Sequence, residues 1–247
     1  MRGSLFQHAV GSGTERFSLQ NPQILAVRLG RETGHDVLAR KGAMVAFQGG
    51  VEFDGHHLTP REHQVYQYTG EQLNLMRCHG TGTVYLAHQA QYLCILDIAQ
   101  DGLVVDGDYI LAFDPQLSWN VVAIQSQENI AAAGAYNMEL RGHGRVALMT
   151  SGKPLVMRVG PQSEAFADAD AVIAWSAGLT TRMEAQTTSS RVWRRRRGTG
   201  EGWTMCFLGE GFVVVQPHEL AGPTQFQAGG GPLGMGAGGY RGNQWGG

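Results

Sequence analysis

The side chains with the strongest capacity to bind a charged ligand lie in the stretch "RVWRRRR". Within one short segment it gathers several guanidinium groups and an indole ring, from Arg191, Trp193, Arg194, Arg195, Arg196 and Arg197. Guanidinium groups hold phosphate oxygens in paired hydrogen bonds, and a tryptophan ring stacks on a base or lies at a lipid interface. The stretch is predicted to form a hairpin tip. This tip either contacts an anionic ligand, or is a solvated loop partnered by acidic residues of a neighbouring subunit.

A second group of chemically capable side chains lies in "HHLTPREH", which holds His56, His57, Glu62 and His63. Imidazole and carboxylate groups are ligands of Zn²⁺ and Fe²⁺. The stretch is rich in turn residues, however, and lacks the His-x-His spacing of metal-binding β-barrels. The sequence therefore predicts a surface loop and no metal or other cofactor. A G-x-S-x-G nucleophile motif is also absent, so no catalytic residue is predicted.

Two Asp-x-Asp pairs occur in "VVDGDYI" and "FADADAV", formed by Asp106 with Asp108 and Asp168 with Asp170. Such pairs suit either a cation site or a tight hairpin turn. A matching N-terminal stretch has Arg40 and Gly42 at these places. Since one copy lacks the acidic residues, the pattern favours turns over a shared metal site.

The motif that reveals most about the fold is a Gly-x-Gly inside "MRCHGTGTVYL" (76–86), "MELRGHGRVAL" (138–148) and "MCFLGEGFVVV" (205–215). A phosphate-binding loop needs a helix that begins just after the glycines. Here β-forming residues follow, and methionine, glycine and valine recur at every second position, the period of a strand. The sequence predicts structural glycines on the inward face of bent strands, at Gly80, Gly82, Gly142, Gly144, Gly209 and Gly211.

These stretches belong to a longer internal repeat. The block 104–119 matches the block 166–181 at the same spacing that separates Met76 from Met138. An N-terminal block, 41–53, fits the same alignment, with Ala46 and Phe47 under Ala112 and Phe113. The two kinds of block alternate, and turn signals separate short strand-like runs. The sequence therefore predicts an all-β fold of three pseudo-repeated antiparallel units.

The third copy differs from the others because both of its faces are apolar. Its outward positions include Leu208 and Phe212, where the second copy has Arg141 and Arg145, and also Val214. A strand that is buried on both sides needs a second covering layer. We expect this face to meet either a partner subunit, which makes these residues an oligomer face, or another segment of the chain.

Length and composition limit the remaining choices. The 247 residues carry a formal net charge of −2, which argues against a whole-protein attraction to nucleic acid. No apolar run approaches the length of a membrane span, and three unpaired cysteines suit a reducing compartment. We expect a cytoplasmic protein, or one peripheral to the membrane. Its single domain is predicted over 1–220, followed over 221–247 by a flexible, disordered tail rich in glycine.

The Gly-x-Gly-x-Val strands, the block "VVDGDYILAFD" and the closing "GEGFVVVQ" together resemble the altered-inheritance-of-mitochondria family and its bacterial relatives, over about residues 20–218. The resemblance implies a fold related to the tryptophan-RNA-binding attenuation protein, with three β-sheets about a pseudo-threefold axis. The mitochondrial members look like inner-membrane organisers that help to maintain cristae, whereas the bacterial members have no established activity, and the resemblance brings no catalytic residues. The arginine run and the glycine-rich tail depart from the family's usual pattern.

Two functions follow as hypotheses. The first is a non-enzymatic scaffold that self-associates and holds protein partners, at a membrane surface or in an envelope or stress assembly. The second is a binding module for nucleic acid or phospholipid headgroups that uses the tip 191–197. A metal-dependent enzyme is a third, weaker alternative.

Overall fold

The computed structural model describes residues 3–11, 13–55, 74–123, 136–185 and 203–217. These residues form short antiparallel strands and two 3-10 turns, η1 (Ser4–His8) and η2 (Gly107–Tyr109). The prediction of an all-β protein is therefore confirmed. Period-two alternation, rather than helical periodicity, runs through the sequence because strands face a core on one side.

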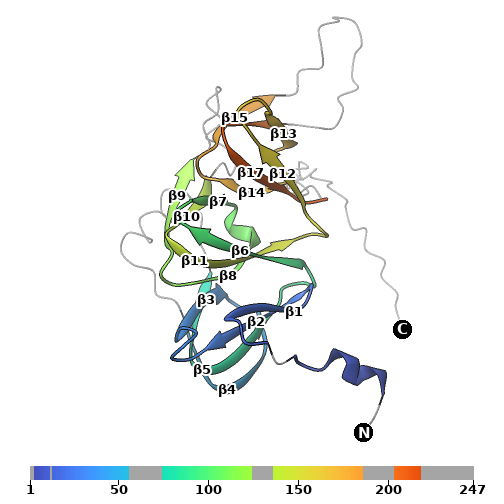
Figure 1. Ribbon diagram of the computed structural model, residues 1–247, viewed down its shortest axis with the longest axis vertical. Coiled ribbons are helices and arrows are strands. Elements are labelled where there is room, and N and C mark those ends of the chain that lie inside the picture. The colour runs from blue at the N-terminus through green and yellow to red at the C-terminus, as the bar shows by residue number, and fades with distance from the viewer. Residues whose placement is uncertain (1–2, 12, 56–73, 124–135, 186–202, 218–247) are drawn as a thin grey trace, which may run out of the picture.

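The strands stack in three layers along the long axis of the molecule (Figure 1). The N-terminal layer contains β1 (Phe17–Asn21), β2 (Ile24–Leu29), β3 (Asp36–Arg40), β4 (Met44–Gly55) and β5 (Leu75–Leu86). The middle layer contains β6 (Tyr92–Ala99), β7 (Leu103–Val105), β8 (Ile110–Phe113), β9 (Ser118–Ala123), β10 (Tyr136–Arg141) and β11 (His143–Thr150). The C-terminal layer contains β12 (Leu155–Val159), β13 (Ala165–Asp168), β14 (Val172–Ser176), β15 (Thr180–Ala185), β16 (Trp203–Leu208) and β17 (Gly211–Val215).

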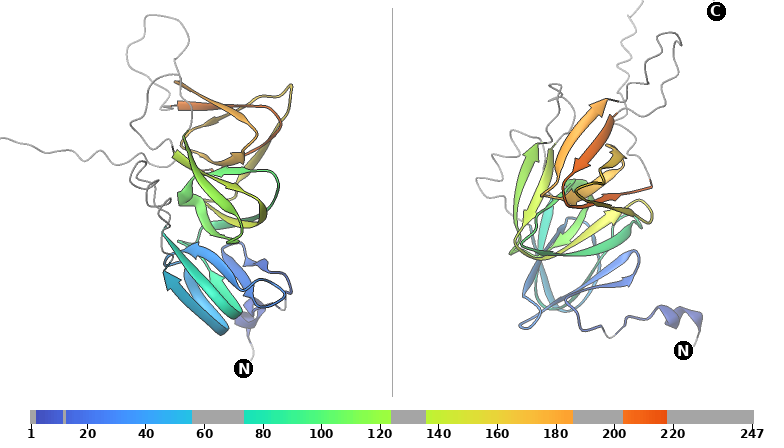
Figure 2. Two further views of the ribbon diagram at one scale, coloured as in Figure 1. Left: turned by 90° about the vertical axis from the view of Figure 1, so that its left-hand side faces the viewer. Right: turned by 45° about the horizontal axis from the view of Figure 1, so that its top comes forward.

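Hydrogen-bonded sheets cross from one layer to the next. The first sheet has eight strands in the order β1-β2-β5-β3-β8-β11-β6, with β4 added beside β5. The second runs β12-β17-β14-β7-β10-β9, and the third is β13-β16-β15. Pairing of β3 with β8 joins the N-terminal and middle layers, and pairing of β7 with β14 joins the middle and C-terminal layers. Figure 2 shows the same stack from two further directions.

The paired glycines lie in strands or in the bends between two strands. Gly80 and Gly82 lie within β5, opposite β4, where an added Cβ would clash with the carbonyl oxygens of Gly50 and Gln48. Gly142 separates β10 from β11, and Gly209 lies between β16 and β17. Gly144 and Gly211 leave space for a neighbouring turn, since an added Cβ would lie 3.0 Å from Asp114 Cβ and 2.7 Å from Ser176 Cβ. All six therefore occupy places where the backbone turns or packs closely.

The apolar side chains form three core clusters, and the central one covers part of the third Gly-x-Gly copy, residues 205–215. Val214 is only 5% exposed and belongs to the central cluster, together with Leu103, Val105 and Ile173. The half-buried Phe212 packs against the same cluster. Val214 is thus covered by the chain's own middle layer, which is the second of the two alternatives predicted for this face. Burying apolar area inside one chain avoids the entropic cost of association.

The two Asp-x-Asp pairs form turns of one kind. The Oδ1 atom of Asp106 accepts a hydrogen bond from the backbone N–H of Asp108 at 2.9 Å, and Asp168 accepts from Asp170 at 2.9 Å. These are tight turns, but the predicted hairpins are wrong, because the flanking strands are not paired with each other. Strand β7 belongs to the six-stranded sheet and β8 to the eight-stranded sheet. Each aspartate pair thus marks a corner at which the chain changes sheets.

Stability is expected to depend on pH through Asp106. Burial, aided by the negative charge of Asp108, raises the pKa of its carboxyl group above the ordinary 3.8. The hydrogen bond from the backbone N–H of Asp108 and the charge of Arg40 oppose this shift. The stabilising contribution is therefore complete at low pH and declines as the pH rises from 3.8 through the raised pKa. Asp106→Asn keeps the accepting oxygen and removes the titration. The free energy of unfolding of the variant minus that of the natural chain should therefore increase as the pH rises across this window. Urea unfolding at a series of pH values measures this difference.

The exposed Glu164→Gln variant is the control for general effects of pH on unfolding. A constant difference between Asp106→Asn and the natural chain at every pH would contradict the role assigned to burial of Asp106.

Candidate interaction surfaces

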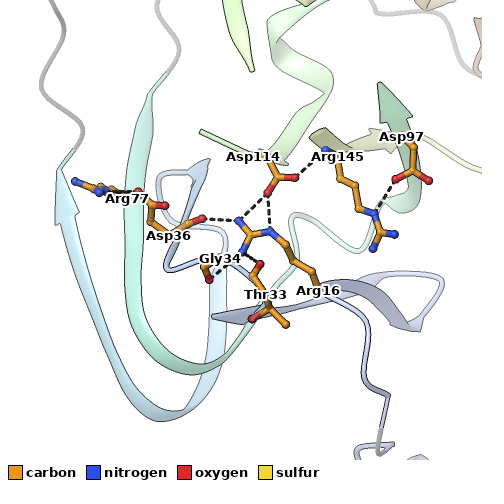
Figure 3. A network of polar contacts seen from close by, with 8 residues as sticks. All are labelled: Arg16, Thr33, Gly34, Asp36, Arg77, Asp97, Asp114 and Arg145. Carbon is orange, nitrogen blue, oxygen red and sulfur yellow. Dashed lines mark hydrogen bonds and ion pairs between the residues drawn. The ribbon is translucent and has the colours of Figure 1, made fainter. Parts of the chain in front are cut away.

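The junction between the N-terminal and middle layers is held by a nearly buried ion pair, shown in Figure 3. Arg16, which immediately precedes β1, approaches Asp114 Oδ1 with Nε at 2.7 Å and with Nη2 at 2.6 Å. Its guanidinium group also donates to the backbone carbonyls of Thr33, Gly34 and Asp36. The side chain of Arg16 is 15% exposed and that of Asp114 only 4%. The pair ties the segment before β1 to the turn after β8.

The second carboxylate oxygen of Asp114 links the turn after β8 to strand β11. Its Oδ2 atom accepts a hydrogen bond from the backbone N–H of Arg145, the third residue of β11, at 2.8 Å. In the C-terminal layer, Ser176 Oγ accepts from the backbone N–H of Phe212 at 3.1 Å in the same way. Neither Asp114 nor Arg16 was predicted from the sequence as a site residue. The sequence did contain a signal for Asp114. In the aligned blocks 104–119 and 166–181, Asp114 matches Ser176, and both are polar side chains that can accept a hydrogen bond in a turn.

The junction between the middle and C-terminal layers contains an open groove. A cavity of about 710 Å³ lies between residues 96–103, the turn 176–178 and residues 210–212. Its lining includes the acidic Asp97, Asp101 and Glu210, with Arg141 beside them. The first junction also has an open cavity, of about 500 Å³, and its lining includes Arg16, Asp114 and Arg145. Each junction therefore carries an open cavity lined by charged side chains.

Apolar side chains are exposed at the two opposite ends of the stack. On β4, in the N-terminal layer, Val45 is 56% and Phe47 is 47% exposed. On β12 and β13, in the C-terminal layer, the exposed side chains are Leu155, Val156 and Phe166. Figure 1 places β4 and β13 far apart, at opposite ends of the molecule. Exposed apolar groups that gather on strands mark surfaces suited to a protein partner.

The arginine-rich stretch, Arg191, Trp193, Arg194, Arg195, Arg196 and Arg197, lies outside the described residues, as do His56, His57 and His63 and the tail 221–247. Anion binding by the tip 191–197 accordingly stays a prediction. Leu208 is described and is half-buried at the end of β16. Among the residues that the structure describes, no three His, Cys, Asp or Glu side chains are grouped to hold a metal ion. None of the helical segments described is long and apolar enough to cross a membrane.

Comparison with known proteins agrees with this architecture. The model of the family described as mitochondrial biogenesis AIM24 matches residues 17–218, whereas no curated protein matches the chain. Among solved structures, the crystal structure of a Streptococcus pyogenes protein is similar, with a TM-score of 0.64. It is 19% identical, and the match covers 83% of this chain and 93% of that one, a likeness that speaks for the fold. Since the family model spans every strand from β1 to β17, the chain belongs to the mitochondrial biogenesis AIM24 family.

Proposed function

We propose that this protein is a non-enzymatic scaffold that self-associates through the ends of its layered stack. The observation that carries the proposal is the exposure of large apolar side chains on β4 and on β12–β13. Phe47 and Phe166 are each about half exposed, although aromatic side chains contribute strongly to protein interfaces when they are buried. Two separate apolar surfaces on one chain allow each molecule to hold more than one neighbour.

We propose further that the stack consists of three related units, as the sequence repeat suggests. Several features support this. The aligned glycines Gly80, Gly142 and Gly209 have φ angles of +115°, +115° and +117°. The corners at Asp106 and Asp168 carry the same side-chain hydrogen bond. Asp114 and Ser176 each accept a hydrogen bond from a backbone N–H of a later strand, β11 and β17 respectively. A modular stack of this kind is suited to assembly, because each unit presents the same edges to its neighbour.

A place for such an assembly is suggested by the family, whose description refers to mitochondrial biogenesis. We propose that this chain, likewise, acts in an assembly rather than in catalysis, at a membrane surface or in a cell-envelope or stress complex. A cytoplasmic location, or one peripheral to the membrane, is part of the same proposal.

Self-association is tested by sedimentation velocity of the full chain across a concentration series. The proposal predicts species at multiples of the 26.7 kDa chain mass, with a weight-average mass that rises with concentration. Because burial of apolar groups drives this assembly, it should persist at high salt, where surface ion pairs are screened. A single 26.7 kDa species at every concentration would overturn the proposal.

A further inference from the structure

The two junctions inside the chain follow one pattern of strand pairing. At each junction, the strand before a corner in one layer pairs antiparallel with the strand after the corner in the next layer, as β3 with β8 and β7 with β14. The residues face each other in the same order: Leu38 with Phe113 and Ala39 with Ala112 at the first junction, and Val104 with Trp175 and Val105 with Ala174 at the second. Each junction thus pairs an aliphatic with an aromatic residue beside a small one.

Pairing buries these side chains almost completely. Phe113 is 0% and Trp175 is 5% exposed, and their aliphatic partners Leu38 and Val104 are 7% and 6% exposed. The buried aromatic rings join the core clusters on either side of the junction. Hydrogen bonding between the strands and burial of these rings together hold one layer to the next.

Strands β4 and β13 match the junction strands in the sequence repeat, but each pairs with one strand instead of two among the described residues. Among the described residues, β4 pairs only with β5, and β13 pairs only with β16. In the sequence repeat, Phe47 aligns with Phe113, and Phe166 aligns with Val104. These two side chains are 47% and 53% exposed, although their counterparts at the junctions are buried. One end of the stack therefore presents one half of a junction, and the other end presents the other half.

Neither β4 nor β13 contains lysine or proline, two of the residues that keep an edge strand from pairing. Native proteins protect such edges with lysine, proline or inward-pointing charge. The segment 44–48, "MVAFQ", has no charged residue and no proline, and "AFA" over 165–167 has none either. Within the part of the chain that the structure describes, neither edge has a second strand partner, and each carries an exposed aromatic ring. Since β4 and β13 lie at opposite ends of one chain, a second copy is what brings the complementary edge to each (Figure 2).

We propose that copies of this chain join head to tail, with β13 of one copy pairing antiparallel with the first half of β4 of the next. The register is that of the internal junctions, which sets Phe166 opposite Phe47 and Ala167 opposite Ala46. This inference rests on the proposed self-association and specifies the contact that produces it. The contact joins two different surfaces, so it generates a ring or an open filament rather than a symmetric dimer.

Cysteine cross-linking tests both the pairing and its polarity. Ala46→Cys and Ala167→Cys are made in separate chains that also carry Cys94→Ser, since Cys78 and Cys206 are buried and leave Cys94 as the remaining partly accessible thiol. Residues that face each other on antiparallel strands lie within reach of a disulfide. Under mild oxidation, a mixture of the two variants should give a two-chain product on a non-reducing gel, and each variant alone should stay a single chain. A mixture of Ala46→Cys with the exposed Glu164→Cys should give none.

Other cross-linking results would overturn the inference. A two-chain product from either variant alone would indicate symmetric pairing of like edges. In a chain that carries both cysteines, the inference predicts a ladder of linked chains. A compact, internally linked monomer would show instead that β13 and β4 meet within one molecule.

Edge-blocking variants provide a second, independent measurement. Phe47→Lys blocks the β4 edge and Phe166→Lys blocks the β13 edge. Because both side chains are partly exposed, the variants should fold, and circular dichroism checks this. Each variant alone should sediment as a monomer. Mixed in equal amounts, the two should form a 1:1 dimer and nothing larger, because together they retain one intact pair of edges.

The outcomes separate this inference from the proposed function. If the natural chain assembles but both blocked variants assemble equally well, the strand pairing is overturned and self-association stands. If the mixture of blocked variants stays monomeric while the natural chain assembles, the pairing is again overturned. A natural chain that is a monomer throughout would overturn the proposed function together with the pairing.

Discussion

Replacing Arg16 with alanine is expected to lower the free energy of unfolding by about 3–5 kcal/mol. The carboxylate of Asp114 is only 4% exposed, and the variant would leave it with the backbone N–H of Arg145 as its remaining described hydrogen-bond donor. The carbonyls of Thr33, Gly34 and Asp36 would lose a shared donor at the same time. Leaving a buried charge without its partner costs more than the pair itself contributes. Urea unfolding followed by circular dichroism measures the loss.

The matched control is Arg77→Ala, which breaks an exposed pair on the same layer. Arg77 Nη2 lies 2.6 Å from Asp36 Oδ2, but its side chain is 54% exposed. Water solvates both groups after the substitution, so the expected loss is about 0–1 kcal/mol. Equal losses for Arg16→Ala and Arg77→Ala would contradict the importance assigned to burial.

A second substitution separates the uncompensated charge from the lost packing. Asp114→Asn in the Arg16→Ala background removes the unpaired charge and keeps an oxygen that accepts from the N–H of Arg145. The double variant should therefore be more stable than Arg16→Ala alone. If adding Asp114→Asn lowers the stability further, the loss in Arg16→Ala comes from packing of the arginine side chain rather than from the charge of Asp114.

Arg16 and Asp114 also illustrate what the sequence does not reveal. Period-two alternation around the Gly-x-Gly stretches was sufficient to predict the all-β class, because alternation is a local pattern that half-buried strands show. The ion pair joins residues 98 positions apart, and neither neighbourhood carries a local signal for the other. Long-range polar contacts depend on how layers stack, and this is decided by the packing of the whole chain.

The covering of Val214 was left open between two alternatives, and the Asp-x-Asp corners were missed, for a related reason. Apolar residues on both faces of 205–215 correctly indicated a second covering layer, but composition does not say whether that layer belongs to the same chain. An aspartate that accepts a hydrogen bond from the second following N–H suits a hairpin and a corner equally well. Only the pairing of β7 with β14, and of β8 with β3, distinguishes the two.

Gly80 and Gly142 allow a test of why the repeated glycines are needed, because both have a φ angle of +115°. Alanine at either position adopts a left-handed backbone conformation at a cost of about 1–3 kcal/mol. The surroundings differ. At Gly142 the nearest atom to an added Cβ is 3.8 Å away, whereas at Gly80 the Cβ would clash with the Gly50 carbonyl oxygen on β4.

Gly80→Ala is therefore expected to destabilise the protein by about 1–3 kcal/mol more than Gly142→Ala, because overpacking adds to the backbone strain. The clash is with backbone, so no side chain can rotate away, and β4 must move from β5 for the variant to fold. Urea unfolding of both variants measures the difference. Equal losses would mean that backbone conformation alone selects glycine here. A larger loss in Gly80→Ala would show that the close approach of β4 and β5 also requires it.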